Sequence, residues 1–300
     1  MTPQISVIVA TYRRDQSLQK ALHSLGEQTF QEFEIVLVDD NDDLAWHKTV
    51  LDLAEEFSRN YPQTPLRFIA DHPNMGSAMA RNRGIHAADG AYITFLDDDD
   101  EYLPDKLEKQ LTAMRSTDAD YCITDLMLYN ESGKLIDKRV RSYLSDTDMR
   151  AAELLLCHLK YHMTGTDTMM FKKSYLLSIG GFDAINMGDE FYLMQKAILG
   201  QGKFCYLQGC SVKAYVHTGE NGISSGQTKI EGENQLFLHK KKYFSEMDAK
   251  SRRYIIMRHH AVLAFAKLRM QKPIAALKDA FLSFCADPVE CVKLCLERKI

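Results

Sequence analysis

The sequence predicts an α/β protein: a mainly parallel, twisted sheet of the Rossmann type, flanked by helices and followed by a C-terminal helical extension. Three observations lead to this prediction. Apolar runs alternate with amphipathic runs through about the first hundred residues, the apolar runs are continuous, and the chain beyond about residue 226 looks wholly helical. Strands that are apolar on both sides need helices over both faces, as in a doubly wound sheet.

The first part of the chain contains four expected strands. They are short apolar runs of strand length, and they cover residues 5–10, 33–38, 66–70 and 91–96. Amphipathic or small-residue segments between them are expected as helices at 17–25, 44–60 and 76–87. This alternation predicts parallel strands joined by helical crossovers.

The pattern is less regular after residue 103. A helix is expected from Pro104, because proline is favoured in a first helical turn, and two strand-like segments around the turn at 130–133 predict a hairpin. Further helices are expected at 151–160 and at about 230–245, 249–270, 273–285 and 288–298. We therefore predict one domain over residues 1–225 and a helical region over 226–300.

The overall composition argues against several classes of protein. A formal net charge of −4 and a pI of about 6.2 give no reason to expect nucleic acid as a partner. Seven scattered cysteines without a C-x-x-C pair are typical of a reducing compartment and predict a cytoplasmic location. The N-terminal apolar run is too short for a signal peptide, and no uncharged apolar stretch reaches 18 residues, so we expect no membrane span.

Four consecutive aspartates, Asp97–Asp100, follow the strand expected at 91–96. Ligands of open α/β sheets bind at the carboxyl ends of strands, so these carboxylates are expected at a binding site. Hard oxygen ligands suit Mg²⁺ or Mn²⁺, which bind one or two protein carboxylates and complete their shell with phosphates and water. The alternative is a solvated acidic loop in which Asp100 or Asp105 stabilises the start of the next helix.

A second acidic pair, Asp39 and Asp40, ends the strand expected at 33–38. The carboxyl ends of parallel strands meet at one edge of the sheet, where a carboxylate can accept hydrogen bonds from a base or a ribose. Two strands that end in acids therefore favour a site for a nucleotide whose diphosphate is bound through a metal ion.

Several segments taken together resemble glycosyltransferase family 2, whose members have the GT-A fold and use nucleotide sugars. These segments are VATY (9–12), VDD (38–40), NMGSAMARNRG (74–84), LDDDD (96–100) and GGFDAINMGDEFYLMQKAILG (180–200). The likeness covers about residues 4–218, and the motifs occur in the family's order and spacing. It implies transfer of a sugar, with inversion, from a nucleotide diphosphate that is expected to be uridine-linked.

This resemblance implies roles for residues near the nucleotide. Thr11 and Tyr12 would lie beside the nucleobase, Asp39 would hydrogen-bond it, and Arg81 would face the nucleotide. Within residues 1–225 the family pattern implies a nucleotide-binding half over about 1–105 and an acceptor-binding half over about 106–225.

The acidic run matches the family's D-x-D motif. Asp99 would be the direct ligand of Mn²⁺ or Mg²⁺ and Asp97 would contact the ribose or the sugar, while Asp98 and Asp100 are alternatives because four aspartates allow a shift of one. The cation and an arginine would stabilise the charge that develops on the leaving diphosphate. His217 resembles a late histidine that some members place near the diphosphate or metal, although a structural role is the alternative.

The missing part of the chemistry is a base. Asp189 and Glu190 are expected in the first turn of a helix, where the helix dipole favours the ionised form. A carboxylate there could take the proton of an acceptor hydroxyl as its oxygen attacks the anomeric carbon. The family usually has E-D, with the second residue as base, so Glu190 is the expected base. The D-E order leaves Asp189 as an alternative, and both acids could merely stabilise the helix.

The sequence of the C-terminal helices does not identify the acceptor substrate. Between His239 and Lys272, ten basic residues meet only two acids. Basic helices with an apolar face can lie on anionic membranes, where the acceptor would be a lipid-linked saccharide at the inner face. We favour the alternative, in which the apolar faces pack on the parent domain. Burial against a second copy is also open, so an oligomer is one of the expectations.

Two rival functions remain. A non-catalytic protein that keeps the fold and binds a nucleotide sugar or a protein partner would fit the unusual DDND at 39–42 and the D-E order, whereas the acidic run and Arg81 argue against it. Nucleotidyl transfer needs a metal and a related sheet, but it commonly has a glycine-rich phosphate loop where this chain has TYRRDQS.

Overall fold

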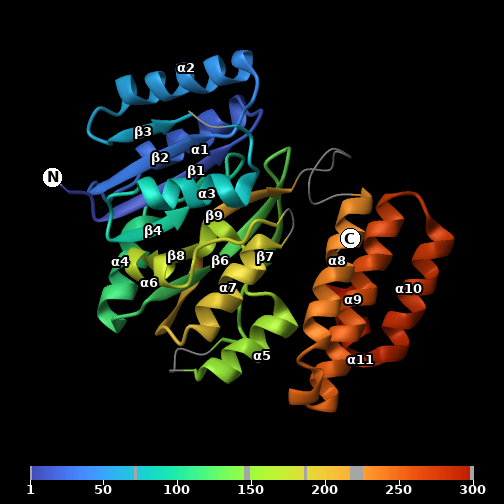
Figure 1. The fold of residues 1–300 in the computed structure, drawn as a ribbon. Coiled ribbons are helices and arrows are strands. Elements are labelled where there is room, and N and C mark those ends of the chain that lie inside the picture. The colour runs from blue at the N-terminus through green and yellow to red at the C-terminus, as the bar shows by residue number, and fades with distance from the viewer. Residues whose placement is uncertain (1, 71–72, 145–148, 186–187, 217–225, 298–300) are drawn as a thin grey trace. The chain divides into compact units, whose positions relative to one another are not determined.

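The computed structural model contains two compact units (Figure 1). It describes residues 2–70, 73–144, 149–185, 188–216 and 226–297. The first unit comprises Met1–Leu155 and Met163–His217, and the second comprises Leu156–His162 and the helices from Gly226 onward. The helix α5 (Ala151–Tyr161) is therefore divided between the units, which the sequence did not suggest. That residues 1–225 and 226–300 are separate domains stays a prediction.

The first unit begins with four parallel strands, as predicted. They are β1 (Ile5–Thr11), β2 (Phe33–Asp39), β3 (Leu66–Ile69) and β4 (Tyr92–Phe95), in the spatial order β3-β2-β1-β4. Nearly every residue of β1 and all of β2 are buried, whichever side of the sheet they point to. Helices therefore cover both faces of this part of the sheet.

The crossover helices occur where the sequence predicted them: α1 (Gln16–Gly26), α2 (Leu44–Asn60), α3 (Ser77–Ala87) and, after β4, α4 (Lys106–Thr117). Helix α2 begins at Leu44 because the Asp43 carboxylate accepts a hydrogen bond of 2.8 Å from the amide of Ala45. The small residues of α3 allow it to lie close to β1, since a Cβ at Gly84 would lie 2.4 Å from Cγ2 of Ile8.

The second half of the sheet mixes strand directions. Strand β8 (Met169–Lys172) lies antiparallel between β4 and β6 (Tyr121–Asn130), and β6 also pairs with β7 (Leu135–Arg139) in the predicted hairpin. The sheet ends with β9 (Phe204–Val216), parallel to β6, and the short β5 (Glu101–Tyr102). Helices α6 (Lys173–Ser178) and α7 (Asp189–Leu199) and the 3-10 turn η1 (Thr166–Thr168) complete this half. The antiparallel β8 brings its own N-terminal end to the edge where β4 finishes.

The second unit is helical, as predicted. It contains α8 (Gly226–Lys241), the 3-10 turn η2 (Phe244–Glu246), α9 (Ala249–Arg269), α10 (Pro273–Ala286) and α11 (Pro288–Glu297). Apolar residues of the basic stretch, such as Ile255, Met257 and Leu263, are buried. That the apolar faces pack on the parent domain stays a prediction. Within the described part of the chain, no helix is long and apolar enough to cross a membrane.

Gly90, just before β4, leads to the first testable prediction. Its amide donates to Oγ of Ser6 (2.9 Å), and a Cβ at this position would lie 2.6 Å from backbone atoms of Ile5 and Ser6. Gly90→Ala is therefore expected to lower the free energy of unfolding by about 1–3 kcal/mol, as overpacking does. Urea denaturation measures this change, with Ala91→Ser at the exposed neighbouring position as the control. Equal stability of the two variants would contradict the close approach of β1 and β4.

Candidate active site

Polar side chains gather where β1, β2 and β4 end. The ends of β1 and β2 are held together, because the amide of Asp40 donates to the carbonyl of Thr11 (2.9 Å). The amide of Tyr12 donates to Oδ2 of Asp98 (3.2 Å), which links β1 to the acidic run after β4. Thr11 is buried, whereas the ring of Tyr12 is 41% exposed, so a ligand could reach Tyr12.

The two acids that end β2 have different roles. Asp39 is buried, and its Oδ1 accepts from the amide (3.1 Å) and the side chain (2.6 Å) of Asn41, while its Oδ2 lies 2.9 Å from Nδ1 of His47. Asp40 instead accepts from the amides of Met75 and Gly76, both at 2.9 Å. Asp40 therefore fixes the loop before α3, and Asp39 is held by Asn41 and His47. Sequence reasoning missed Asn41 and His47.

Arg81, on α3, joins the acidic run to the start of α7. Its guanidinium donates to Oδ1 of Asp97 (2.6 Å) and to Oδ2 of Asp189 (2.9 Å), and its Cζ lies 5.5 Å from the ring centroid of Phe182. Burial alone would lower the pKa of Arg81, but the charges of Asp97 and Asp189 outweigh it and raise the pKa. The arginine is thus held permanently charged between two carboxylates.

Asn82, the next residue along α3, positions the turn before α7. Its side-chain amide donates to the carbonyl of Phe182 and its Oδ1 accepts from the amide of the same residue, both at 2.8 Å. A Cβ at Gly181, which has a φ of +58°, would lie 2.5 Å from this Oδ1. Asn82 is therefore a structural residue, and glycine is required at the turn.

Three carboxylates form the centre of the site: Asp97, Asp100 and Asp167 each offer an oxygen, and these oxygens lie within 4.8 Å of one another. The amide of Asp97 donates to Oδ1 of Asp167 (2.6 Å), and Oδ1 of Asp100 accepts from the amide of Tyr215 on β9 (2.8 Å). The alternative in which Asp100 stabilises the start of α4 is therefore wrong. Asp105 takes the N-cap position of α4, but no capping hydrogen bond from its side chain is found there.

Asp98 and Asp99, the middle two residues of the acidic run, lie beside the guanidinium of Arg14. Arg14, in the turn after β1, lies 2.8 Å from Oδ2 of Asp99 and 3.5 Å from Oδ1 of Asp98. The expected metal ligand Asp99 is therefore paired with a guanidinium here, outside the group of Asp97, Asp100 and Asp167. Sequence reasoning did not single out Arg14, although it lies in the segment that distinguishes this chain from a phosphate-loop protein.

Removal from water raises the pKa values of several acids in the site. Burial and the neighbouring Asp99 raise the pKa of Asp98 to about 7, and burial and Asp97 raise that of Asp167 to about 7. Burial, followed by the charge of Asp167, also raises the pKa of Asp100. The raised pKa values mean that ionisation of these clustered acids is unfavourable. A positive charge bound among them would reduce that cost.

Lys106 provides a buried positive group near the site. It is fully buried, its Nζ lies 2.9 Å from Oη of Tyr102 and 4.0 Å from that ring's centroid, and it also donates to the hydroxyl of Thr94. Burial lowers the pKa of Lys106 to about 7, against the opposing charge of Asp167. From the sequence alone, Lys106 is one more lysine in an amphipathic helix.

The two acids that open α7 are in different surroundings. Asp189 is ion-paired with Arg81, whereas Oε2 of Glu190 accepts a hydrogen bond of 3.1 Å from the hydroxyl of Thr166. Burial raises the pKa of Glu190, and the charges of Asp189 and Asp97 raise it further, while Arg81 and Thr166 oppose the shift. Glu190 is thus a carboxylate whose pKa is raised by burial, and Asp189 is a partner of the arginine.

The structure brings together most of the predicted residues. Hydrogen bonds join Tyr12 to Asp98, and join Arg81 to Asp97 and Asp189; the two groups meet where Asp97 and Asp98 are adjacent in the chain. The amide of Arg13 donates to Oδ1 of Asn41 (2.8 Å), which is the link from this group to Asp39. His217 and the glycine-rich segment after it lie outside the described residues. Asp167 and Thr166 were missed because nothing in the sequence shows that β8 runs antiparallel to β4.

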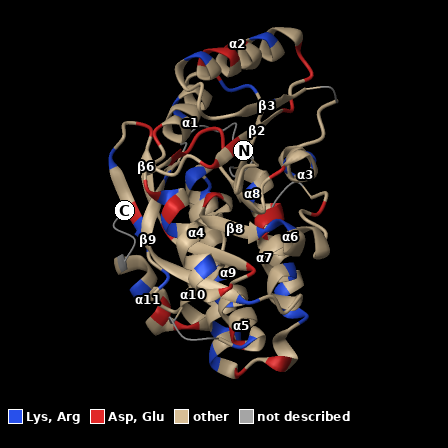
Figure 2. Cartoon of the chain, turned by 90° about the vertical axis from the view of Figure 1, so that its left-hand side faces the viewer, with Lys and Arg blue, Asp and Glu red and all other residues tan. Residues whose placement is uncertain are grey.

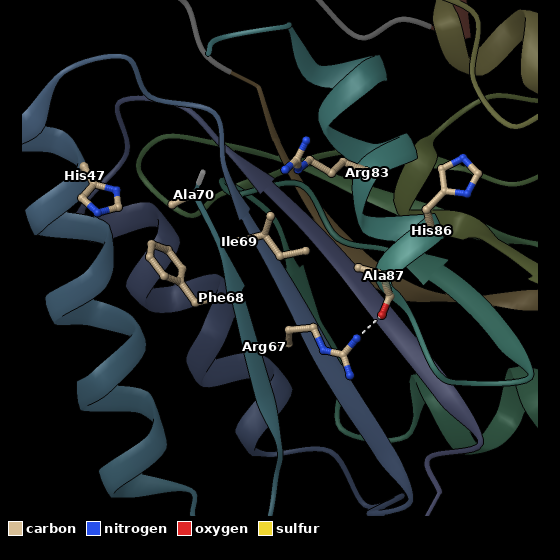
Figure 3. Close-up of a pocket in the computed structure, with 8 residues that line it drawn as sticks. All are labelled: His47, Arg67, Phe68, Ile69, Ala70, Arg83, His86 and Ala87. Carbon is tan, nitrogen blue, oxygen red and sulfur yellow. Dashed lines mark hydrogen bonds between the residues drawn. The ribbon is translucent and has the colours of Figure 1, made fainter. Parts of the chain in front are cut away.

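A groove of about 820 Å³ lies at the β3 edge of the sheet (Figure 3). It is lined by His47, by Arg67, Phe68 and Ile69 of β3 with Ala70 after them, and by Arg83, His86 and Ala87 of α3. The His47 ring lies 5.7 Å from the ring of Phe68, and Arg67 donates to the carbonyl of Ala87 (Figure 3). His47 therefore contacts both the groove and Asp39, whereas the acidic run takes no part in lining the groove.

The chain is similar in sequence to known glycosyltransferases. The family model of glycosyl transferase family 2 matches residues 6–177, which is more than half of the chain. An uncharacterised glycosyltransferase of Methanocaldococcus jannaschii is 26% identical over 226 residues, covering 74% of each chain. A putative teichuronic acid biosynthesis glycosyltransferase of Bacillus subtilis, TuaG, is 29% identical over 140 residues, covering 47% of this chain and 53% of its own.

Solved structures show the same fold. S. aureus TarS 1-349 in complex with UDP-GlcNAc has a TM-score of 0.60 at 18% identity, covering 95% of this chain and 90% of that one. The mannosyltransferase PcManGT from Pyrobaculum calidifontis, in complex with GDP-Man and Mn²⁺, has a TM-score of 0.58 at 16% identity, covering 99% and 79%. Identities this low establish the GT-A fold alone. Together with the match of the family model, they show that this chain belongs to glycosyltransferase family 2.

Proposed function

We propose that the protein transfers a sugar from a nucleotide diphosphate, with UDP as the expected nucleotide, to an acceptor hydroxyl in polysaccharide or glycoconjugate synthesis. One observation carries the proposal: Arg81 donates hydrogen bonds both to Asp97 of the acidic run and to Asp189 of α7. The carboxylates proposed to hold a cation and the acids proposed to supply the base therefore lie on either side of one guanidinium. A leaving diphosphate needs the first and an attacking hydroxyl needs the second.

The donor set of the site fits a divalent cation. Oxygens of Asp97, Asp100 and Asp167 lie within 4.8 Å of one another, and carboxylate oxygens suit Mn²⁺ or Mg²⁺. Arg14 lies beside Asp99, the D-x-D position at which the family resemblance expects the metal ligand. A bound cation would neutralise negative charge on the diphosphate as it leaves. PcManGT, which was solved with Mn²⁺, supports a metal here.

The chain's own residues bind and orient the donor. Asp39 would accept a hydrogen bond from the nucleobase, since His47 and Asn41 hold its carboxylate in place, and Tyr12 would lie beside the base together with Thr11. Arg81 would stabilise the developing charge of the diphosphate, and Asp97 would contact the ribose or the sugar. Asp98, which accepts from the amide of Tyr12, would help to hold this loop.

Glu190 is proposed as the base of a single displacement that inverts the anomeric configuration. Its carboxylate would accept the proton of the acceptor hydroxyl as that oxygen attacks the anomeric carbon and the bond to the diphosphate breaks. The raised pKa brings the base closer to neutral pH, and the hydroxyl of Thr166 orients it. Asp189 forms an ion pair with Arg81, which supports Glu190 rather than Asp189 as the base.

The remaining parts of the proposal concern partners and location. Solved TarS complexes with UDP-GlcNAc and UDP support a uridine-linked donor, and TuaG supports a polysaccharide-type product. None of the seven cysteines, all within the described ranges, forms a disulfide, which supports the cytoplasm. A lipid-linked saccharide is the proposed acceptor class, and His217 is kept as a candidate metal ligand. An oligomer is proposed as an alternative use of the C-terminal helices.

Donor binding is the first test. Calorimetric titration of UDP is expected to show binding with Mn²⁺ and little without it, and Asp99→Ala should remove the metal-dependent part. Asp137→Ala, at an exposed position on β7, is the control and should bind as the wild type does. No binding of UDP, GDP or dTDP under any metal would favour the rival function, a non-catalytic protein that keeps the fold.

Catalysis by Glu190 makes a second prediction. Glu190→Gln should lower the rate of transfer about 10²–10⁴-fold while UDP affinity changes little, because only the base is lost. Asp189→Asn should weaken donor binding as well, since it removes a partner of Arg81. Release of UDP from a set of UDP-sugars with pooled acceptors measures the rate of transfer by each variant, and calorimetric titration of UDP measures donor binding. In the wild type, activity should be lost as the pH is lowered, and the loss should begin above the ordinary pKa of glutamate, because the raised pKa lets Glu190 take up its proton earlier. Full activity of Glu190→Gln would exclude this residue as the base.

The raised pKa of Asp98 predicts a dependence of stability on pH in EDTA. An acid whose pKa rises from 3.8 to about 7 on folding makes stability fall as pH increases through that window. Between pH 5.5 and 8 the wild type should lose about 2 kcal/mol more than Asp98→Asn, which has no such group. Urea unfolding at both pH values measures the difference, with Asp137→Asn as the control. Equal losses in the wild type and Asp98→Asn would contradict the burial of this acid.

A further inference from the structure

Arg141, which follows the hairpin strand β7, is a buried arginine in the second half of the sheet. It is 4% exposed. The strands around it carry few charges: β6 and β8 hold one charged residue each, Asp125 and Lys172, and are mostly tan in Figure 2. A buried charge loses its hydration, so a protein keeps it only where other groups compensate for that loss.

The guanidinium of Arg141 donates to oxygens on two separate segments. Its Nε donates to the carbonyl of Thr124 on β6 (2.9 Å), and its Nη2 donates to the carbonyl of Thr164 (2.6 Å). The same Nη2 lies 3.4 Å from Oγ1 of Thr168, so its hydrogen bonds in the described part of the chain all reach neutral oxygens. Arginine presents its donors in a fixed planar fork, which lets one side chain bond two carbonyls in one geometry.

The main chain of Arg141 is anchored to β6. Its amide donates to Oδ1 of Asp125 (2.9 Å), and its carbonyl accepts from the amide of Leu144 (2.8 Å). Asp125 is itself buried and held, because its Oδ1 also accepts from the hydroxyl of Tyr206 (2.8 Å) and its Oδ2 accepts from the amide of Gly209 (3.0 Å). The arginine therefore extends from a fixed point on β6 to the turn before β8.

That turn, η1, carries two residues of the candidate site. The hydroxyl of Thr166 donates to Oε2 of Glu190 (3.1 Å), and Oδ1 of Asp167 accepts from the amide of Asp97 (2.6 Å). Both turn residues are buried. The hydrogen bonds of Arg141 within the described chain reach the two ends of the turn, on either side of these residues.

The turn packs against the same strand that anchors the arginine. Gly165 has a φ of +111°, and a Cβ there would lie 3.1 Å from Cδ2 of Leu126 on β6. The carbonyl of Gly165 accepts from the amide (2.9 Å) and the hydroxyl (2.7 Å) of Thr168. Strand β6 is therefore the common support of the arginine and of the turn.

We propose that Arg141 is a positioning residue of the proposed reaction, because it holds η1 in place for Thr166 and Asp167. Thr166 then orients Glu190, and Asp167 completes the group of three carboxylates. This role rests on the proposed function, in which Glu190 is the base. Loss of the arginine would release the ends of the turn, and a displacement of about 1 Å of an oriented group can lower a rate about 100-fold.

Transfer rates of the wild type, Arg141→Gln, Thr166→Val and the double variant test this role. At saturating UDP-sugar, Arg141→Gln is expected to lower kcat roughly 10–100-fold and Thr166→Val about tenfold. The double variant should stay within about threefold of Arg141→Gln, because both changes act through the same hydrogen bond to Glu190. A loss equal to the product of the two single losses, or a full rate in Arg141→Gln, would overturn the proposal.

The pH profile of transfer separates positioning from a general structural effect. Burial and the charges of Asp189 and Asp97 raise the pKa of Glu190, whereas Arg81 and the hydroxyl of Thr166 oppose the rise. Both single variants remove the effect of that hydroxyl, so the low-pH loss of activity should begin at a higher pH, by the same amount in each. A profile that only one of the two variants shifts would contradict the role.

Two further variants control for folding and for surface charge. Arg141→Lys keeps the charge but bonds fewer carbonyls at once, so its kcat should lie between those of the wild type and Arg141→Gln, and it replaces the glutamine variant if that one does not fold. Arg59→Gln changes an arginine of the first unit whose side chain is 68% exposed, and it should transfer as the wild type does.

Hydrogen exchange tests the hold on the turn without any need for activity. In Arg141→Gln the amides of residues 163–168 should exchange faster than in the wild type, while those of β1 and β2 should keep their rates. Unchanged exchange at 163–168 would overturn the proposal even if the protein transfers sugar. A wild type that neither binds a nucleotide nor transfers would instead refute the proposed function, and the role in the reaction would fall with it.

Discussion

The architecture of the site depends on how buried negative charge is balanced at one edge of the sheet. Asp97, Asp100 and Asp167 lie within 4.8 Å of one another, and carboxylates that close cannot all be ionised without nearby cations. Arg81 provides one such cation and lies between Asp97 and Asp189. Because its two partners belong to the loop after β4 and to α7, the same ion pairs also hold that loop next to the start of α7.

Strand direction decides which acids reach this edge. The parallel strands β1, β2 and β4 bring their carboxyl ends there, whereas β8 runs the other way and brings its amino end. Asp167 therefore reaches Asp97, and Thr166 reaches Glu190, although both are far from these partners in sequence. A wholly parallel sheet would have placed η1 at the opposite edge. The antiparallel strand thus completes the carboxylate group and orients the proposed base.

Neighbouring residues of the same chemical type have separate functions here. Asp39 and Asp40 are adjacent, yet one is held by His47 and Asn41 and the other holds the loop before α3. Asp189 and Glu190 are likewise adjacent, but the guanidinium of Arg81 takes the first and leaves the second to Thr166. In each pair the backbone sends successive side chains in different directions, so their partners, rather than their own chemistry, separate their roles.

The sequence by itself determined the α/β class, the parallel strands of the first half, the hairpin, the helical extension and the family. These follow from the period of apolar residues and from short motifs, both of which are local along the chain. Only the tertiary structure decided that β8 is antiparallel and that Asp167, Thr166, Arg14 and Lys106 belong to the site or its surroundings. Long-range pairing sets these features, because contacts between distant segments depend on packing and charge balance in three dimensions, which local patterns do not encode.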